Sequence, residues 1–136
     1  MAVEYLKSGR DTILLTDTAY DRELIELSQE VGEKSGMDLT EVGDYVRSLI
    51  GRMAKEVLDS AAVSGVYLTG GDTALGMLMN IGADGSEILA EILVGVPLVR
   101  VKGGAMRDLT GNKGRAFGTE DAAAFAMRKI KERGGI

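Results

Sequence analysis

The chain has 136 residues, of which 45% are hydrophobic, and this size suits one domain with a substantial core. Its net charge of −5 and its isoelectric point near 4.8 argue against a broad basic face, and therefore against nucleic acid or an anionic membrane as a partner. The lack of cysteine excludes disulfide and thiolate chemistry, and the lack of histidine removes the commonest metal ligand and general base. Any catalysis would therefore use carboxylates, lysine, backbone amides and an oxygen-bound cation such as Mg²⁺.

The first quarter of the chain predicts a strand and a helix after a polar start. Residues 1–11 have no clear period and are interpreted as a linker. Residues 12–16, Thr-Ile-Leu-Leu-Thr, predict a short buried strand, and the following Asp17 and Thr18 are good turn or cap residues. A helix is expected over about residues 19–34, with Gly36 as its C-terminal stop.

The next helix has the clearest pattern in the sequence. Asp38 and Glu41 have the spacing of a capping box at its start. Apolar residues then recur at spacings of three, one and four, while charged residues fall on the other face, as in an amphipathic scaffold helix. The apolar set is Leu39, Val42, Tyr45, Val46, Leu49, Ile50, Met53 and Val57. We interpret its tyrosine and methionine as core residues and not as cofactor contacts.

A strand, a glycine turn and a helix start form the central feature of the sequence. A β-branched and aromatic run at residues 66–69 meets Gly70 and Gly71, and Asp72 with Thr73 then opens an apolar helical stretch. One interpretation is a tight turn with Asp72 as the helix N-cap, and for this motif alone it is the simpler one. The other is a phosphate site, because glycines let the backbone approach a ligand and the positive end of a helix favours an anion.

The chain beyond this turn alternates between short elements. The helix after Thr73 is apolar nearly all round and is expected to be buried, and residues 82–85 close it. From Ile88 the apolar residues alternate, which predicts two short strands around Pro97, a residue typical of an edge or a bend. The last helix is expected over about residues 119–133, with Thr119 as its cap. Its inward stripe consists of Phe125, Ala126 and Ile130.

Residues 100–118 form a basic stretch with five glycines, which contains five cations and a single acidic residue, Asp108. The cations are Arg100, Lys102, Arg107, Lys113 and Arg115. A local positive field beside flexible backbone suits a polyphosphate. A charged surface hairpin that faces water is an equally good interpretation, so the composition leaves both open.

The order of elements is strand, helix, helix, strand, helix, strands, glycine-rich loop and helix. This alternation predicts an α/β domain in three layers, with a mixed or mostly parallel sheet and helices on both faces. If strands 12–16 and 66–69 lie parallel, residues 16–18 and 70–73 converge at the carboxyl edge of the sheet, where ligands of such folds bind. The glycine spacing is that of neither a P-loop nor a dinucleotide fingerprint.

Four motifs follow one another along the chain. They are Val-Tyr-Leu-Thr-Gly-Gly-Asp-Thr-Ala at residues 66–74, Gly-Val-Pro-Leu at 95–98, the glycine pair at 103–104, and Lys113 with Phe117-Gly118 before an acidic helix start. The ordered set resembles the C-terminal nucleotide-binding domain of the four-carbon acid sugar kinases, the family of threonate, erythronate and oxo-tetronate kinases. The resemblance covers nearly the whole chain from about Lys7.

The resemblance implies that the diglycine turn holds the phosphates of ATP, that a hydroxyl at the end of the first strand contacts the nucleotide, and that the late segment closes over it. The implied contacts to phosphates or Mg²⁺ are Gly70, Gly71, Asp72 and Thr73, with Asp72 as the metal ligand. The hydroxyl role falls to Thr16 or Thr18, and the closing segment contributes Lys113, Gly114 and Gly118. The chain departs from the family's pattern where Thr-Asp-Thr replaces the usual serines, and where Arg115 replaces a usual glycine and leaves Gly114 one position early.

The acid-sugar-binding N-terminal domain of that family has no counterpart in residues 1–136, which are expected to form a single nucleotide-binding domain. Because positioning of the acceptor hydroxyl supplies most of the rate in phosphoryl transfer, we expect the chain to bind nucleotide but to transfer phosphate poorly without a substrate-binding domain or subunit. The alternative is a non-catalytic nucleotide-binding or protein-interaction domain. An uncovered apolar face would favour a homo-oligomer. Neither a signal peptide nor a membrane-length apolar run is present, so a soluble, cytoplasmic protein is expected.

Overall fold

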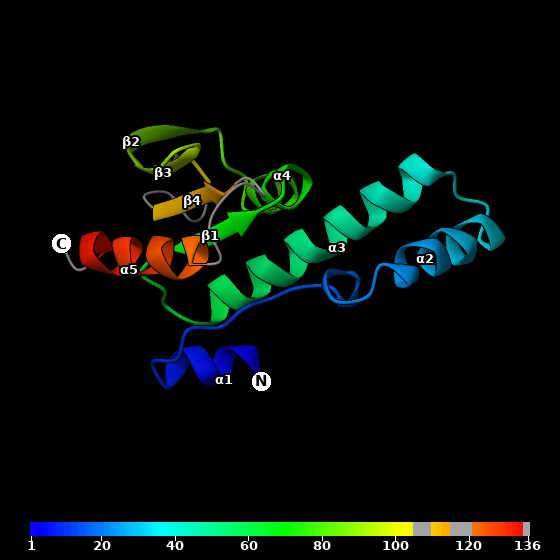
Figure 1. Cartoon of the computed structure of the whole chain (residues 1–136), viewed down its shortest axis with the longest axis horizontal. Coiled ribbons are helices and arrows are strands. Elements are labelled where there is room, and N and C mark those ends of the chain that lie inside the picture. The colour runs from blue at the N-terminus through cyan, green and yellow to red at the C-terminus, as the bar shows by residue number, and fades with distance from the viewer. Residues whose placement is uncertain (105–109, 115–120, 135–136) are drawn as a thin grey trace.

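The structure is a computed structural model that describes residues 1–104, 110–114 and 121–134. Its centre is a four-stranded sheet in the order β1-β4-β3-β2, as Figure 1 shows. The strands are β1 (Val66–Thr69), β2 (Gly85–Leu93), β3 (Val96–Lys102) and β4 (Thr110–Gly114). β1 and β4 run parallel, whereas the other two neighbouring pairs run antiparallel. The predicted α/β class is therefore confirmed, with a mixed sheet, and the arrangement in three layers stays a prediction.

The β2–β3 hairpin confirms the two strands predicted around Pro97. Gly95 turns the chain with a φ of +75°, a backbone conformation that glycine adopts without strain. The pairing shifts register between Glu91 and Leu93, at the place where Pro97 lies opposite. Because β3 is an interior strand, Pro97 marks a β-bulge and not a sheet edge.

The sequence analysis did not predict β4, whose residues fall in the stretch that was interpreted as a glycine-rich loop. Its sequence, Thr-Gly-Asn-Lys-Gly, has a low strand propensity. The strand lies between β1 and β3 and pairs with both of them. Pairing on two sides thus overrides the local preference of these residues.

α3 (Leu39–Ser60) begins at the predicted capping box. The Glu41 N–H donates to Asp38 Oδ1 at 2.9 Å, and the Asp38 N–H donates to Glu41 Oε2 at 2.8 Å. Both N–H groups lie at a helix start, where no helical carbonyl can reach them. The side chains of the capping box therefore fix the first residue of the helix.

Asp38→Ala is expected to lower the free energy of unfolding by about 1 kcal/mol, the usual cost of losing an N-cap side chain. Urea denaturation followed by circular dichroism measures this change. Thr40→Ala is the matched control, because Thr40 is exposed in the same first turn. An equal loss of stability in both variants would contradict a specific role for the cap.

α3 packs across α4 (Gly71–Asn80), and the two helices approach closely because glycines lie where they cross. Gly51 and Gly76 are both buried there. Met77 and Ile81 of α4 form a buried cluster with Val101 of β3, which joins this helix pair to the sheet.

α5 (Ala122–Gly134) contacts β1, β2 and β4. Its predicted inward residues Ala126 and Ile130 are buried, and Phe125 is half-buried beside the cations of Arg128 and Lys129. The inward stripe expected from the sequence is therefore confirmed. The predicted cap Thr119 lies outside the described residues.

The N-terminal segment differs from the sequence-based expectations. Residues interpreted as a linker form α1 (Ala2–Lys7). Residues 12–16 are extended but are not paired as a strand, and Ile13 is 82% exposed, so the prediction of a buried strand here is wrong. The β-forming composition of the segment is not sufficient, because a strand is stabilised through its cross-strand neighbours.

α2 (Glu23–Lys34) starts later than the predicted residue 19. A short 3-10 turn, η1 (Asp17–Ala19), precedes it, and Asp21 Oδ1 then accepts the N–H of Glu23 at 3.0 Å. Such local side-chain bonds compete with the helical hydrogen bonds. Gly36 has a φ of +80° after the last turn of α2, which confirms it as the helix stop.

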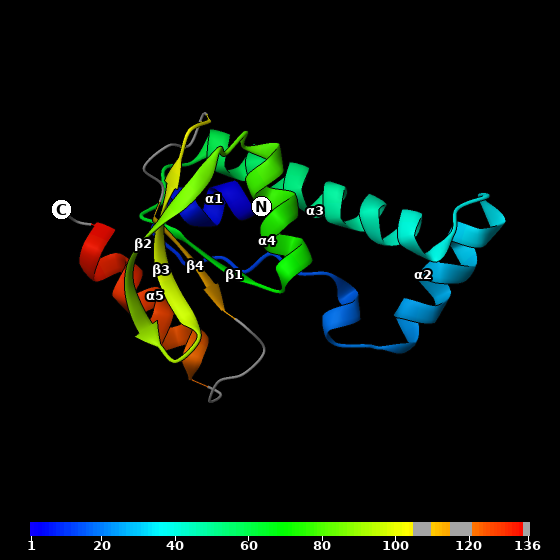
Figure 2. The same ribbon diagram turned by 90° about the horizontal axis from the view of Figure 1, so that it is seen from above.

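α2 and the first half of α3 project away from the sheet as a pair of helices (Figures 1 and 2). Much of the apolar stripe of α3 is therefore exposed, contrary to the prediction of a core face. The exposed members are Leu39, Tyr45, Leu49 and Met53. α4 also exposes Leu75 and Met79, although it was expected to be buried on all sides. In the part of the chain that is described, we find no helix that is both long enough and apolar enough to cross a membrane.

Candidate functional site

The diglycine turn connects β1 directly to α4. Gly70 has φ and ψ of +85° and 130°, a combination that other residues avoid. It is the N-cap of α4, and its carbonyl accepts the N–H of Ala74 at 3.1 Å. Asp72 is therefore the second residue of the helix. The interpretation of Asp72 as the helix N-cap is wrong.

The first N–H groups of α4 have no partner among the described residues, and no side chain caps the helix. Gly71 and Asp72 are exposed, and a Cβ added to Gly71 would meet no atom within 4 Å. Unpaired N–H groups and the positive end of the helix dipole together favour an anion. The turn is thus open to a ligand, and its backbone can be approached closely.

The pairing of β1 with β4 brings a second group of predicted site residues to this turn. Thr69 is paired with Gly114, and Leu68 is paired with Lys113. Because the two strands are parallel, their carboxyl ends lie at the same edge of the sheet. Lys113 and Gly114 therefore lie one strand away from the diglycine, although the chain separates them by some forty residues. The third predicted residue of the closing segment, Gly118, lies outside the described residues.

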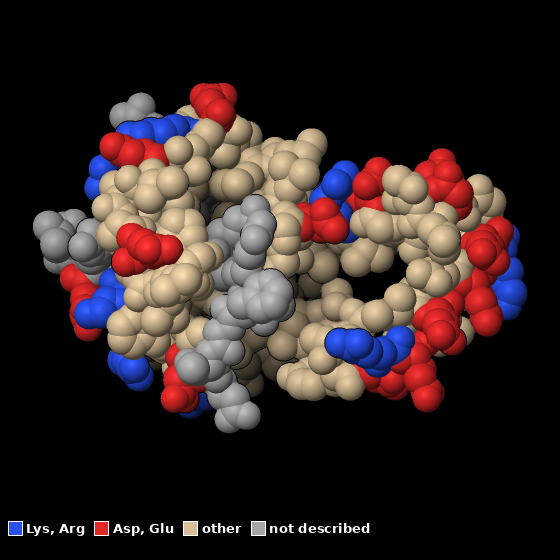
Figure 3. Space-filling view, turned by 45° about the horizontal axis from the view of Figure 1, so that its top comes forward, with Lys and Arg blue, Asp and Glu red and all other residues tan. Residues whose placement is uncertain are grey.

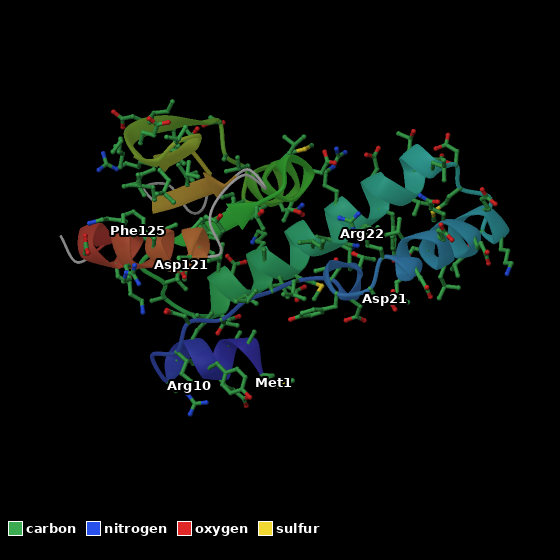
Figure 4. The ribbon with its side chains drawn as sticks, in the orientation of Figure 1. Met1, Arg10, Asp21, Arg22, Asp121 and Phe125 are labelled. Atoms are coloured by element: carbon green, nitrogen blue, oxygen red, sulfur yellow. The ribbon has the colours of Figure 1, made fainter. Side chains whose placement is uncertain are left out.

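Thr18 lies in η1 and Thr16 is its N-cap, apart from this edge. Their Oγ1 atoms are 2.6 Å apart, at hydrogen-bond distance, and η1 packs against α2. In Figure 4 the neighbouring Asp21 and Arg22 lie along the projecting helices, away from Phe125 on α5 and from Asp121 just before it. The expected convergence of residues 16–18 with residues 70–73 required a strand at residues 12–16, and this condition is not met.

Two cations of the basic stretch are engaged in the β2–β3 hairpin. Lys102 Nζ lies 2.8 Å from Glu87 Oε2, and Arg100 lies 3.7 Å from the same oxygen. The hydrogen bond and the charge of Lys102 lower the pKa of Glu87 below its ordinary value, and Arg100 adds a smaller effect in the same direction. For these two cations the surface-hairpin interpretation holds. Arg107 and Arg115 lie outside the described residues.

Asp72 is the predicted metal ligand. The described residues contain no group of three or more acidic, histidine or cysteine side chains that could hold a metal ion by themselves. Mg²⁺ in phosphoryl-transfer sites is usually bound by one or two carboxylates together with substrate phosphates and water. A single exposed carboxylate on the first turn of α4 is chemically suited to that shared mode of binding.

Fold and site together define an α/β domain with an open, glycine-bounded helix start at the carboxyl ends of two parallel strands. The family model described as a nucleotide-binding C-terminal domain matches residues 1–123 of this chain. The chain belongs to this family, the C-terminal nucleotide-binding domains of the four-carbon acid sugar kinases.

Two curated relatives are D-threonate kinases. The chain is 30% identical to the enzyme of Salmonella typhimurium over 133 residues, which are 96% of this chain and 31% of the relative. It is 32% identical to the enzyme of Bordetella bronchiseptica over 103 residues, which are 75% of this chain and 24% of the relative. The chain thus spans about a quarter to a third of the length of these kinases.

Two similar crystal structures are of a domain of unknown function from Bordetella bronchiseptica, described as a domain-swapped dimer with bound citrate. One has a TM-score of 0.59 and 33% identity, and covers 72% of this chain and 24% of that chain. The other has a TM-score of 0.60 and 26% identity, and covers 97% of this chain and 39% of that chain. The second likeness covers nearly the whole chain and therefore includes both the sheet and the projecting helices.

Proposed function

We propose that this chain is the ATP-binding domain of a four-carbon acid sugar kinase. In this proposal the phosphates of ATP bind the N–H groups at residues 70–73, and the Asp72 carboxylate shares Mg²⁺ with them. The single observation that supports it is the pairing of Thr69 with Gly114, because this pairing brings the predicted phosphate-binding turn and the predicted closing segment to one edge of the sheet. Lys113, Gly114 and Gly118 are proposed to complete the nucleotide site, together with a hydroxyl of Thr16 or Thr18 once the segment at residues 12–18 has come to this edge.

The kinase activity itself is proposed to need a substrate-binding domain or subunit. The attacking hydroxyl must be aligned with the γ-phosphate of ATP, and this alignment supplies most of the catalysis in phosphoryl transfer. No group in the described residues is assigned to hold a sugar acid. The chain is expected to bind ATP and Mg²⁺ and, by itself, to transfer phosphate poorly or not at all.

Two structural features belong to the same proposal. Helices α3 and α4 are proposed to cover one face of the sheet and α5 the other, which gives the three layers expected from the sequence. The chain is also proposed to self-associate, because the two similar crystal structures are described as domain-swapped dimers.

Asp72→Ala is expected to weaken ATP binding in the presence of Mg²⁺ by roughly tenfold or more, because a charge-assisted contact to a phosphate-bound cation is lost. Isothermal titration calorimetry of the chain with ATP, with and without Mg²⁺, measures the effect. Glu30→Ala is the matched control, since it removes an exposed carboxylate from α2. Binding that is equal in the wild type and in both variants would exclude Asp72 from the site. Absence of binding by the wild type would favour a non-catalytic interaction domain.

A further inference from the structure

Asp72 shares one face of α4 with Gly76 and Asn80. The three residues follow one another at intervals of four, so they lie one above another along the helix. This face meets α3, because a Cβ added to Gly51 of α3 would collide with the Gly76 carbonyl and the Asn80 side chain. Asp72, the proposed metal ligand, is therefore on the α3-facing side of α4, one helical turn before the point where the helices cross.

Arg47 of α3 covers Gly76 on that face. A Cβ at Gly76 would lie 2.7 Å from Arg47 Cγ, so the stem of the arginine passes directly over this glycine. Gly51 meets Gly76 and Asn80, whereas Arg47, one turn earlier in α3, meets Gly76. The contacts thus move toward the start of α4 as one moves toward the start of α3. Arg47 is on the same side of the crossing as the proposed phosphate site.

The guanidinium of Arg47 is within reach of the first turn of α4. Gly76 is five residues from Gly71, which is about 7.5 Å along a helix axis, comparable to the length of an extended arginine side chain. Helical side chains lean toward the helix N-terminus, and Arg47 Nη2 accordingly lies 2.8 Å from Asp44 Oδ1. The Arg47 side chain is 27% exposed, so its stem is packed while its charged end reaches solvent.

Cations are scarce on this side of the molecule. Residues 39–50 contain one cation, Arg47, beside two carboxylates, and Asp72 is the only charged residue of α4. Figure 3 shows mostly acidic side chains along the projecting helices, with cationic and acidic ones together where these helices meet the body. ATP keeps a net negative charge when it carries one Mg²⁺, and Lys113 would approach it from the sheet. A guanidinium has five donors, so its ion pair with Asp44 leaves donors for a phosphate.

We infer that Arg47 is a phosphate-binding residue of the nucleotide site. This inference rests on the proposed function. The stem of Arg47 stays over Gly76, and its guanidinium turns from Asp44 to the phosphates that lie against the start of α4. The triphosphate is then held from three sides, by Arg47 of α3, by the first N–H groups of α4 and by Lys113 of β4. An ordinary surface ion pair between Arg47 and Asp44 is the competing explanation, and such a pair has little effect on stability.

Arg47→Met tests the inference, because methionine removes the charge and keeps an unbranched stem to cover Gly76. The dissociation constant of ATP in the presence of Mg²⁺, measured by isothermal titration calorimetry, is expected to rise roughly tenfold or more. Arg47→Lys keeps the charge but loses the planar fork, so an intermediate loss is expected. Arg52→Met is the matched control, since Arg52 is an exposed arginine of the same helix beyond the crossing, and it is expected to bind ATP like the wild type.

Inorganic tripolyphosphate is the second ligand, because it offers the phosphates without the nucleoside. Arg47→Met is expected to weaken its binding by the same factor as that of ATP. Wild-type affinity for ATP in Arg47→Met overturns the inference and leaves the proposed function intact, and so does a loss confined to ATP. If Arg47→Met is unfolded by circular dichroism, Arg47→Lys decides alone, since loss of the fork must still weaken both ligands. If the wild type binds neither ligand, the proposed function itself fails.

Discussion

Gly76→Ala and Gly51→Ala are each expected to destabilise the chain strongly. A Cβ at position 76 would lie 2.6 Å from the Arg47 carbonyl oxygen, and a Cβ at position 51 would collide with the Gly76 carbonyl and the Asn80 side chain. Backbone atoms cannot move aside as a flexible side chain can, so α3 and α4 must separate. Overpacking of this kind costs about 1–3 kcal/mol, and occasionally more.

The α3 helix offers a matched control for this effect. Gly43 lies in the same helix, and a Cβ added there would meet no atom within 4 Å. Gly43→Ala is expected to raise the free energy of unfolding by roughly 0.5–1 kcal/mol, because glycine is a poor helix former. Urea denaturation of the three variants should give opposite signs for position 43 and for positions 51 and 76. A stabilised Gly51→Ala would show that the two helices do not cross at these glycines.

The parts of the fold that could be predicted are those with a local physical signal. The capping box of Asp38 and Glu41 uses side chains three residues apart, and the diglycine turn requires a positive φ at Gly70. The buried stripe of α5 follows from helical spacing. In each case the residues that decide the structure are neighbours in the chain, so their pattern is visible without coordinates.

The parts that could not be predicted depend on partners that are distant in sequence or lie outside the chain. β4 has little strand propensity and exists because β1 and β3 pair with it. The apolar stripe of α3 indicates a face that avoids water, but periodicity does not say whether this chain covers it. The close crossing at Gly51 and Gly76 has no sequence signal of its own, since a glycine in a helix pattern is usually only a weak point.

Of the candidate site, too, the sequence predicts only the part that has a local signal. The turn at residues 70–73 was visible as a motif, whereas its closeness to Gly114 could be expected only from the family resemblance, because parallel pairing joins distant segments. Thr16 and Thr18 were assigned to the site on the premise of a strand at residues 12–16, which this chain does not form by itself. No local signal in the Thr-Gly-Asn-Lys-Gly sequence indicates β4, because glycine weakens the interior of a strand.

Gly71→Ala is expected to weaken ATP binding by roughly tenfold or more, while leaving the stability of the chain unchanged or slightly higher. Without a ligand the substitution causes no steric clash, because no atom lies within 4 Å of the added Cβ. Gly71 also does not have a positive φ, so alanine fits its backbone conformation. With a phosphate at the helix start, the same methyl group would occupy the approach to the first N–H groups of α4. Losing one hydrogen bond to a charged phosphate costs about 1.5–3 kcal/mol, which corresponds to the stated loss of affinity.

Calorimetric titration with ATP and urea denaturation on the same preparations separate binding from folding. Gly43→Ala is again the control, since it adds the same methyl group to an equally open position in the first half of α3, which projects away from the sheet. The proposed phosphate site requires that only Gly71→Ala lose affinity. If both variants bind ATP like the wild type, the phosphates do not lie against the backbone of α4, and the nucleotide must be bound elsewhere. If both lose affinity together, the loss arises from folding or from the projecting helices and not from the glycine turn.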